Sequence, residues 1–535
     1  MRKQILNFLA FMVVGLALIN CANRGTPNGG ERDRTPPVIT RTSPENYSTD
    51  FDAKEIRIYF DEYIKITNLQ KNLIISPPMD PQPEITPLGS ASKFITIKIY
   101  DTLSPNTTYA FNFGESIVDN NEDNPYPFYR YVFSTGDYID SLSVGGSVRD
   151  ALSRNPDEFV TVMLYEIDST FTDSVIYQRK PNYVTNTSDS TSTFNIQNVK
   201  EGKYLMVALK DENNDYIFQQ KTDKIGFVAD EVELPTDTTF TIELFKELID
   251  YKALSPRQIG GQKIAFGYEG SYEEMKIEIL ENIPDDFENR VIKAKDKDSL
   301  YYFFKPKLEA DSLIFVVRHP KSVDSFVVRR KDQFKDSLKL SNIQTGVIGL
   351  DQPFEIEGNV PLVNFNKDFA TLLDKDSVVV DFETKLDTLK NRYQISFKKK
   401  EDNNYQMRLL PGAITDFFGN VNDTLNYALN TRTADDYGNL RLTIQNAVYP
   451  IIVQLVDAQE TVAMEKYATE SGFVEFNNIN PSKYFIRVIN DTNGNGIYDP
   501  GNYLSKRQSE KVTYYPSELD VRASWYYTEQ FTMKQ

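Results

Sequence analysis

Oxygen-bearing side chains recur at regular spacing in NDTNGNGIYDPGNY, residues 490–503. Counted from the first aspartate, they occupy positions 1, 3, 5 and 9, and a glycine stands at position 6: Asp491, Asn493, Asn495, Asp499 and Gly496. Ca²⁺ prefers carboxylate and amide oxygens, and glycine at position 6 permits the sharp turn of a calcium-binding loop. The spacing therefore predicts a structural Ca²⁺ site. The alternative is a turn in which Asn and Asp hydrogen-bond their own backbone.

A weaker version of this pattern lies earlier in the chain. It keeps oxygen donors at Asp211, Asn213 and Asp215, but Tyr216 stands in place of the glycine. Neither loop has the bidentate glutamate at position 12 that completes an EF-hand, and neither is followed by a helical pattern. With two carboxylates, the later loop is expected to bind Ca²⁺ with a Kd of roughly 10⁻⁴–10⁻³ M. A plain turn is the preferred interpretation of the earlier loop, and no cofactor is expected to be required.

Residues suited to catalysis are scarce. Cys21 is the only cysteine and His319 the only histidine of 535 residues, which excludes a disulfide framework, a cysteine-based zinc site and a multi-histidine metal centre. His319 ends an apolar strand pattern without a nucleophile elbow nearby, so we expect a surface or edge-strand histidine. No pair of carboxylates stands out for glycoside hydrolysis. We therefore expect that the protein is not an enzyme, and a carboxylate-based hydrolase is the least favoured alternative.

The chain starts with the pattern of a secretory signal. Arg2 and Lys3 precede an apolar run over residues 5–19 that is short for a membrane span. The letters LINC, which end at Cys21, resemble the lipobox of bacterial lipoproteins. This resemblance implies a signal peptide over 1–20, acyl chains on Cys21 and a flexible linker over 21–36. An ordinary signal peptide that contains a cysteine is the alternative.

Charge and periodicity narrow the class of protein. The chain has 59 basic and 77 acidic residues, a formal charge of −18, so nucleic acid and anionic lipid surfaces are poor partners. Its length predicts several domains. Apolar and polar residues alternate with period two in segments such as EIRIYFDEYIKI (55–66) and LRLTIQN (440–446), whereas long helical patterns are nearly absent. The sequence therefore predicts an all-β chain of β-sandwich modules.

Two internal repeats support several modules. The segment NVKEGKYLMVALKDENNDYIFQ, residues 198–219, aligns without gaps with NINPSKYFIRVINDTNGNGIYD, residues 478–499, at an offset of 280. Residues 103–137 and 402–436 share a tyrosine-bearing strand pattern, a turn around Asp119 or Asp416, and a final strand that ends in Thr and Asp. Each repeat is expected to be part of one kind of sandwich.

These repeats resemble known families. TPPVITRTSPENYSTDFDAKEIRIYFDEYI resembles the opening of the SbsA-type (Big_5) bacterial Ig-like domain, and the 198–219 repeat resembles transthyretin-like or carboxypeptidase-regulatory-like sandwiches. The leader CANRGTPNGGERDRTPP resembles outer-membrane lipoproteins of Bacteroidota. The resemblances imply a string of Ig-like and transthyretin-like modules after a lipoprotein signal peptide. The expected Ig-like domains span 37–138, 248–339 and 340–434 (the last a second SbsA-like copy), and the transthyretin-like domains span 139–247 and 435–535.

These resemblances imply a non-catalytic, lipid-anchored envelope protein. The preferred role is an accessory subunit of an outer-membrane complex for barrel assembly, secretion or uptake, with outer-membrane proteins as partners. The alternative is an independent adhesin or glycan-binding lipoprotein, in which Trp525, Tyr526 and Tyr527 would stack on sugar. Alternation around these residues favours a terminal core strand instead. We expect Cys21 to anchor the protein in the outer membrane. We expect the protein to face the cell surface, and the periplasmic face is the alternative.

Asp-Ser and Asp-Thr pairs followed by an apolar residue recur along the chain, for example at 298–300 and 311–313. They resemble the O-glycosylation acceptor motif of Bacteroidota envelope proteins. The alternative is that each pair simply starts a strand after a turn.

Overall fold

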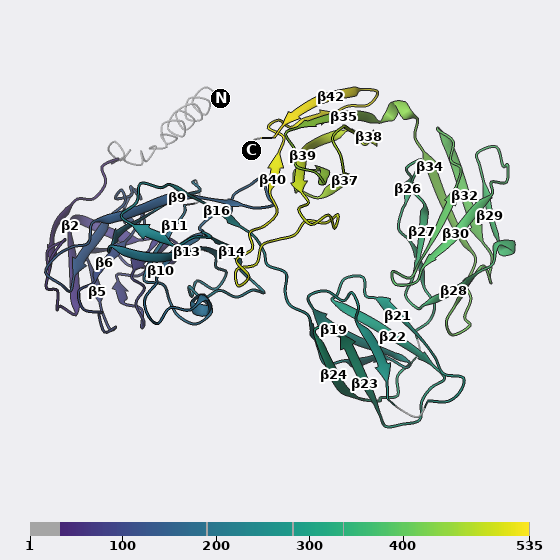
Figure 1. Ribbon diagram of the computed structural model, residues 1–535, viewed down its shortest axis with the longest axis horizontal. Coiled ribbons are helices and arrows are strands. Elements are labelled where there is room, and N and C mark those ends of the chain that lie inside the picture. The colour runs from purple at the N-terminus through teal and green to yellow at the C-terminus, as the bar shows by residue number, and fades with distance from the viewer. Residues whose placement is uncertain (1–32, 189–190, 281–282, 335, 534–535) are drawn as a thin grey trace, which may run out of the picture.

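The computed structural model describes residues 33–188, 191–280, 283–334 and 336–533. Strands dominate these ranges (Figure 1), and the helices are short: α2 (Leu69–Asn72), η1 (Asp173–Tyr177), η2 (Lys367–Phe369) and η3 (Ala434–Asp436). Strands form where apolar residues alternate with polar ones. In β2 (Glu55–Ile66), Ile56 and Ile58 are buried while Arg57 between them is exposed. The expectation of an all-β fold is confirmed.

The strands form successive β-sandwich groups, here called modules 1 to 5. Module 1 spans residues 39–134, module 2 spans 142–244, module 3 spans 252–329, module 4 spans 340–431 and module 5 spans 438–532. Within each module, two sheets face each other across an apolar core.

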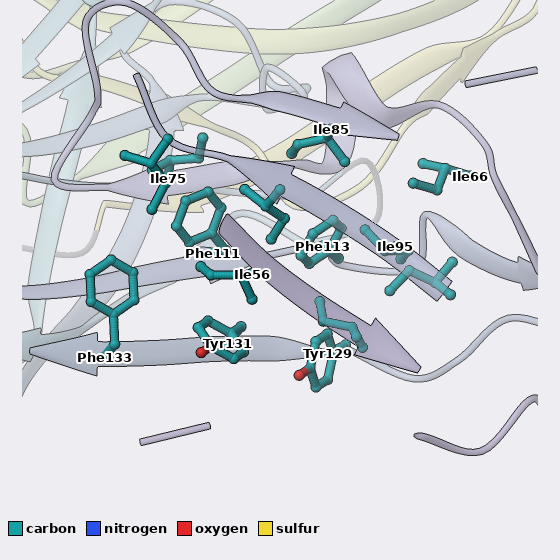
Figure 2. Close-up of a cluster of buried hydrophobic side chains, with 14 of the residues drawn as sticks. Ile56, Ile66, Ile75, Ile85, Ile95, Phe111, Phe113, Tyr129, Tyr131 and Phe133 are labelled. Carbon is teal, nitrogen blue, oxygen red and sulfur yellow. The ribbon is translucent and has the colours of Figure 1, made fainter. Parts of the chain in front are cut away.

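Module 1 has a sheet of order β1-β2-β5-β4, with β7 on β2, and a second sheet of order β3-β6-β8. Its strands besides β2 are β1 (Ile39–Ser43), β3 (Ile74–Ser76), β4 (Glu84–Thr86), β5 (Ser92–Lys98), β6 (Thr108–Asn112), β7 (Ile117–Asp119) and β8 (Arg130–Ser134). Isoleucines and aromatic rings fill the space between the sheets (Figure 2). Phe133 stacks on Phe51 with ring centroids 3.8 Å apart and lies beside Tyr109 at 5.4 Å.

Module 4 repeats this topology. Its sheets run β25-β27-β31-β30 and β26-β34-β32-β29, and the β28-β33 pair corresponds to β7 on β2. The strands are β25 (Leu340–Asn342), β26 (Gly346–Val347), β27 (Phe354–Gly358), β28 (Leu362–Phe365), β29 (Ala370–Leu373), β30 (Phe382–Asp387), β31 (Arg392–Phe397), β32 (Asn403–Leu409), β33 (Ile414–Asp416) and β34 (Leu425–Thr431). Asp119 and Asp416 end the equivalent strands β7 and β33 and accept hydrogen bonds from the backbone N–H groups that follow. The predicted repeat of 103–137 in 402–436 is confirmed.

Modules 2 and 5 share a second topology. Module 2 has sheets β12-β9-β16 and β11-β10-β13-β14, with β15 on β13. Module 5 has β38-β35-β42 and β37-β36-β39-β40, with β41 on β39. The module 2 strands are β9 (Leu142–Asp150), β10 (Thr161–Glu166), β11 (Tyr183–Asn186), β12 (Thr193–Val199), β13 (Gly202–Lys210), β14 (Lys224–Phe227), β15 (Val232–Leu234) and β16 (Phe240–Leu244).

The module 5 strands are β35 (Gly438–Gln445), β36 (Ile451–Val456), β37 (Val462–Ala468), β38 (Phe473–Ile479), β39 (Ser482–Asn490), β40 (Val512–Tyr514), β41 (Leu519–Val521) and β42 (Tyr526–Thr532). β38 and β39 lie 280 residues after β12 and β13, as the sequence repeat predicts. In both modules the last strand pairs in parallel with the first. The two stretches are therefore copies of one fold.

Module 3 has sheets β17-β19-β22-β21, with β18 on β19, and β20-β23-β24. If β17 and β18 count as one strand A, this is the ABED and CFG arrangement of a constant-type immunoglobulin sandwich. Its strands are β17 (Lys252–Ala253), β18 (Arg257–Gly260), β19 (Lys263–Glu269), β20 (Lys276–Ile279), β21 (Glu288–Lys293), β22 (Ser299–Lys305), β23 (Ser312–His319) and β24 (Ser322–Arg329).

The string of modules closes on itself (Figure 1). Modules 2 and 3 are joined by an ion pair between Lys221 and Glu269 at 2.8 Å. Modules 3 and 4 share a small apolar cluster made of Ile292, Phe303, Val360 and Phe417. Module 5 follows through η3 and packs back against module 2, where its Tyr503 is completely buried. Modules 2 to 5 therefore form a closed set, and module 1 packs against module 2 outside it.

Candidate functional site

The loop after β39 brings the predicted oxygen donors together. Asp491 is buried, and its carboxylate accepts hydrogen bonds from the backbone N–H groups of Gly494 (2.8 Å), Asn495 (3.2 Å) and Gly496 (2.8 Å). Asn495 also donates its amide to Asp499 Oδ2 at 2.7 Å, and Asn493 donates to the same oxygen at 2.5 Å. These contacts are those of the self-bonded turn that the sequence left as the alternative. The Ca²⁺ site stays a prediction.

The loop after β13 has the same backbone. Asp211 accepts N–H hydrogen bonds from Asn213 (3.0 Å), Asn214 (2.8 Å) and Tyr216 (2.8 Å). Asp215 accepts from the backbone of Ile217 and from the side-chain amide of Gln219, each at 2.8 Å. The turn expected here is therefore present. In the described ranges, no three His, Cys, Asp or Glu side chains gather in an arrangement that could hold a metal ion.

The pKa values of the two buried aspartates are shifted in opposite directions. Burial pushes the pKa of Asp491 upward, but hydrogen bonds from Gly496, Tyr467 and the neighbouring backbone outweigh it and leave the pKa below its usual value. At Asp211 burial is the larger effect, so its pKa is raised despite comparable backbone donors.

Beyond the turn, module 5 carries an insertion that module 2 lacks. Leu209 pairs with Ile225 across β13 and β14, whereas the equivalent Ile489 pairs with Val512, so the module 5 loop is seven residues longer. The extra length carries Tyr503, which lies in an apolar cluster on module 2. Sequence analysis missed this residue. The gap that opens in the repeat alignment just after residue 499 is the signal that could have found it.

Aromatic rings of module 2 surround Tyr503. Its ring centroid lies 5.4 Å from that of Phe227 and 6.5 Å from that of Tyr177, both edge-on. Its hydroxyl is buried and has no hydrogen-bond partner among the described residues. Burial raises the pKa of this phenol well above its usual value. A Cβ on Gly501 would collide with the Phe245 ring, so only glycine permits the close approach there.

Polar contacts complete the interface between modules 2 and 5. The Tyr503 N–H donates to the buried carboxylate of Glu247 at 2.6 Å. The carbonyl oxygen of Leu152 accepts a hydrogen bond from the Tyr514 hydroxyl at 2.9 Å, and the Arg154 guanidinium lies 3.6 Å from the Phe485 ring centroid. The interface thus combines an apolar anchor with satisfied hydrogen bonds around it.

A cavity of about 750 Å³ lies along the same interface. Its lining contains two carboxylates, Asp150 and Glu243, which are the candidates for an acid and base pair in the hydrolase alternative. Asp150 forms an ion pair with Lys224 at 2.6 Å and accepts N–H bonds from the backbone, while Glu243 pairs with Arg149. Carboxylates held by cations in this way do not resemble the free acid and base pair of a glycosidase.

The remaining predicted residues are dispersed. His319 ends β23, the central strand of its sheet rather than an edge strand, and stacks on Tyr251 at 3.7 Å. Trp525 and Tyr526 flank the start of β42, a terminal strand as expected, but they point outward and are 53% and 56% exposed. The strand still contributes to the core through Phe531, with Tyr527 packed against it, so the expected terminal core strand is present. Cys21 lies outside the described residues, and no described helix is long and apolar enough to cross a membrane.

Comparisons with known proteins identify one module. Residues 33–135 match the family model Big_5, the bacterial Ig-like domain. This segment is module 1. Its Ig-like resemblance is confirmed, whereas the transthyretin-like resemblance of modules 2 and 5 stays a prediction. A search of curated proteins finds no match to the chain.

Solved structures align over long stretches at low identity. Domains 1–6 of surface layer protein SbsC align at 12% identity over 91% of this chain and 67% of that chain, with a TM-score of 0.16. The Bacillus anthracis TIE protein aligns at 9% over 95% and 76%, with a TM-score of 0.15. The I67–I69 fragment of titin aligns at 10% over 53% and 98%, with a TM-score of 0.12. TM-scores this low support no argument about arrangement or function.

Proposed function

We propose that the chain is a non-catalytic, lipid-anchored envelope scaffold that binds outer-membrane proteins as an accessory subunit. The lipobox-like LINC ending at Cys21 and the Ig-like match of module 1 support the anchor and the scaffold class. The observation that carries the proposal is the packing of module 5 on module 2. A chain of modules joined only end to end would flex, whereas a closed set holds its outer surfaces in fixed relative positions.

Several binding surfaces are then available at once. Sandwich modules bind through loops and strand edges, and the closed arrangement presents those of different modules together. An outer-membrane machine for barrel assembly, secretion or uptake offers a large protein surface for such contacts. The acyl chains on Cys21 would hold the scaffold next to it.

A second candidate function is binding of glycans. Phe473, Trp525 and Tyr526 are exposed on module 5, and the rings of Trp525 and Tyr527 lie 5.9 Å apart. Exposed aromatic faces stack on sugar rings. This observation favours an independent glycan-binding lipoprotein or adhesin over a complex subunit.

Pull-down of the tagged chain from gently solubilised outer membranes tests the proposal. We expect mass spectrometry to identify an outer-membrane protein in stoichiometric amount. A Cys21→Ser chain should no longer be acylated, should leave the membrane fraction and should no longer recover the partner. Recovery of the lipoprotein alone would overturn the subunit role. If the lipoprotein is recovered alone and also binds to a glycan array, and if Trp525→Ala abolishes that binding, the second candidate function is established instead.

A further inference from the structure

A cavity of about 870 Å³ lies between modules 1 and 2. This volume is within the range of small-molecule and peptide sites. Strand β4, its flanking loops and α2 form the module 1 side, while the Asp211 turn and the ends of β10 and β11 form the module 2 side. The cavity is distinct from the interface between modules 2 and 5.

The lining is divided by chemistry. All of its aliphatic side chains belong to module 1, among them Leu69, Leu73, Met79 and Leu88. Ile66, Ile75 and Ile85 also line it, and Figure 2 shows these three along one side of the module 1 core, above Phe111 and Phe113. Module 2 contributes polar side chains and Tyr216. An occupant therefore needs an apolar face and a polar face.

Primary amides are the dominant polar groups of the cavity. They are Asn68, Gln70, Gln82, Asn186, Asn213 and Asn214. Each amide both donates and accepts hydrogen bonds, as a peptide group does. The Asn186 Oδ1 atom is buried and has no hydrogen-bond partner among the described residues. The one charged lining residue, Glu84, is held by the Tyr100 hydroxyl at 2.6 Å. The Lys98 ammonium nitrogen also lies 3.5 Å from this carboxylate, so the described lining offers no unpartnered charge and favours an uncharged ligand.

A strand edge is available in the same cavity. β4 ends its sheet, which has the order β1-β2-β5-β4, so β4 pairs with β5 on one side and with no described strand on the other. All of its residues, Glu84 to Thr86, line the cavity. Edge strands offer unpaired backbone groups that an extended peptide can join.

We propose that this cavity binds an extended, uncharged peptide segment with aliphatic side chains. The peptide would add along β4, place its side chains against the aliphatic lining and pair its backbone with the amides. A sugar fits less well because Tyr216 is the only aromatic ring in the lining, and an acyl chain would leave the amides unpaired. The inference rests on the proposed function only in that the peptide would belong to a partner protein.

This binding mode also gives the Asp211 turn a role. The Asp211 carboxylate holds the backbone of Asn213, Asn214 and Tyr216, and all three side chains line the cavity. The turn thereby holds the Asn214 amide at a fixed position for a ligand, while the Asn213 amide nitrogen donates to Gln219 within the turn.

A phage-displayed library of random 12-residue peptides, panned on the full chain in detergent, tests the site. We expect enrichment of uncharged sequences rich in Leu, Ile and Val, and synthetic copies that bind by fluorescence polarisation. Leu88→Arg should weaken binding at least tenfold, because Leu88 is 64% exposed and the change places a charge in the aliphatic lining without disturbing the core. Asn214→Gly should weaken it severalfold, since glycine keeps the φ of 56° and removes only the amide.

Val448→Arg is the matched control, a change at a 72% exposed residue of module 5, and should leave binding unchanged. No enrichment, enrichment of charged peptides, or equal binding to Leu88→Arg would each overturn the site. Binding of neutral oligosaccharides that Leu88→Arg removes would assign the cavity to sugar and overturn it as well. If the pull-down recovers a partner but the library yields no peptide, only the proposed peptide site is rejected. If the library yields peptides but the pull-down recovers no partner, only the outer-membrane partner is rejected.

Discussion

Asp491 and Asp211 build the repeated turn together with a second buried carboxylate, Glu510 in the later copy and Asp223 in the earlier one, which also accepts backbone N–H groups of the loop. Gly496 and Tyr216 occupy the same place in the two copies, and both have left-handed backbones, with φ of 77° and 63°. Glycine adopts this conformation without cost, whereas a bulky residue adopts it only when its surroundings hold it there. In both copies the buried aspartate at the start of the turn accepts the N–H group of this residue. The turn therefore depends on the aspartate more than on the glycine.

Calcium titration tests the later loop. We expect isothermal titration of the full chain to show one weak site, with a Kd of about 10⁻⁴–10⁻³ M, because two carboxylates and two amides supply the ligands. Asp499→Asn should abolish the heat, whereas Asp215→Asn in the sibling loop should not. Absence of heat at about 10 mM Ca²⁺, well above the expected Kd, would leave the turn as the whole role of these residues.

Lowering the pH should change the stability contributions of Asp491 and Asp211 in opposite directions. The lowered pKa of Asp491 stabilises the fold above the unfolded-state pKa, and this stability is lost as pH falls through the folded-state pKa. The deficit of Asp491→Asn, about 1–3 kcal/mol at pH 7 for poorly satisfied N–H groups, should therefore shrink toward pH 3. The raised pKa of Asp211 reverses the sign, because the wild-type fold gains stability on protonation.

The deficit of Asp211→Asn should accordingly grow toward pH 3. Urea unfolding midpoints of the wild type and both variants at several pH values measure these differences, since all other carboxylates cancel between wild type and variant. Parallel pH dependence of the two variants would contradict the assignment.

At the scale of elements, close backbone approach decides which strands can meet. In β9, Gly146 lies opposite Phe194 of β12 on one side and Phe240 of β16 on the other. An added Cβ would collide with the Phe240 carbonyl oxygen and with the Phe194 ring. The glycine therefore allows β9 to pair with both neighbours and keeps the aromatic ring in the core.

Gly146→Ala should destabilise module 2 by about 1–3 kcal/mol, the usual effect of overpacking. Hydrogen exchange with mass spectrometry should show faster exchange in peptides from β9 and β12, and little change in modules 3 and 4. Gly472→Ala is the control, because nothing lies within 4 Å of a Cβ built there. Equal protection in both variants would mean that the sheet adjusts at no cost.

At the scale of the whole molecule, a single tyrosine closes the set of modules. Tyr503 is fully buried between modules 2 and 5, although modules 3 and 4 separate these two modules along the chain. Its removal would leave an apolar hole next to Phe227. Closure is thus expected to depend on this anchor more than on the nearby ion pair between Lys506 and Asp173, whose side chains are partly exposed and whose contribution is small.

Tyr503→Ala should open the closed set, because loss of a buried aromatic side chain removes about 3–5 kcal/mol of packing. Small-angle X-ray scattering should show a larger radius of gyration, with each module still folded by circular dichroism. Tyr503→Phe should stay closed, since the hydroxyl has no partner to lose, and Leu504→Ala, at an exposed neighbour, should also stay closed. An unchanged radius for Tyr503→Ala would show that the polar contacts suffice.

The strands, the turns and the repeated fold could be predicted from the sequence, because they depend on local chemistry or on similarity within the chain. Period-two alternation predicted the strands, because one face of each strand must be buried. The Asp and Asn spacing predicted the earlier turn and gave the later turn as the alternative to a Ca²⁺ site, since the N–H groups held by the first aspartate of each turn lie at most five residues away. The offset of 280 predicted that two stretches share one fold. Each of these depends on neighbours in the chain or on similarity between two segments.

Only the tertiary structure decided which modules meet. The Tyr503 anchor, the exposure of Trp525 and the amide-lined cavity all arise where residues far apart in the chain come together, and no periodicity encodes such contacts. The seven-residue insertion marks the Tyr503 loop in the alignment, but its length does not say which apolar cluster receives the ring. That choice depends on the shape and burial of the partner surface, a property of the folded modules and not of any segment alone.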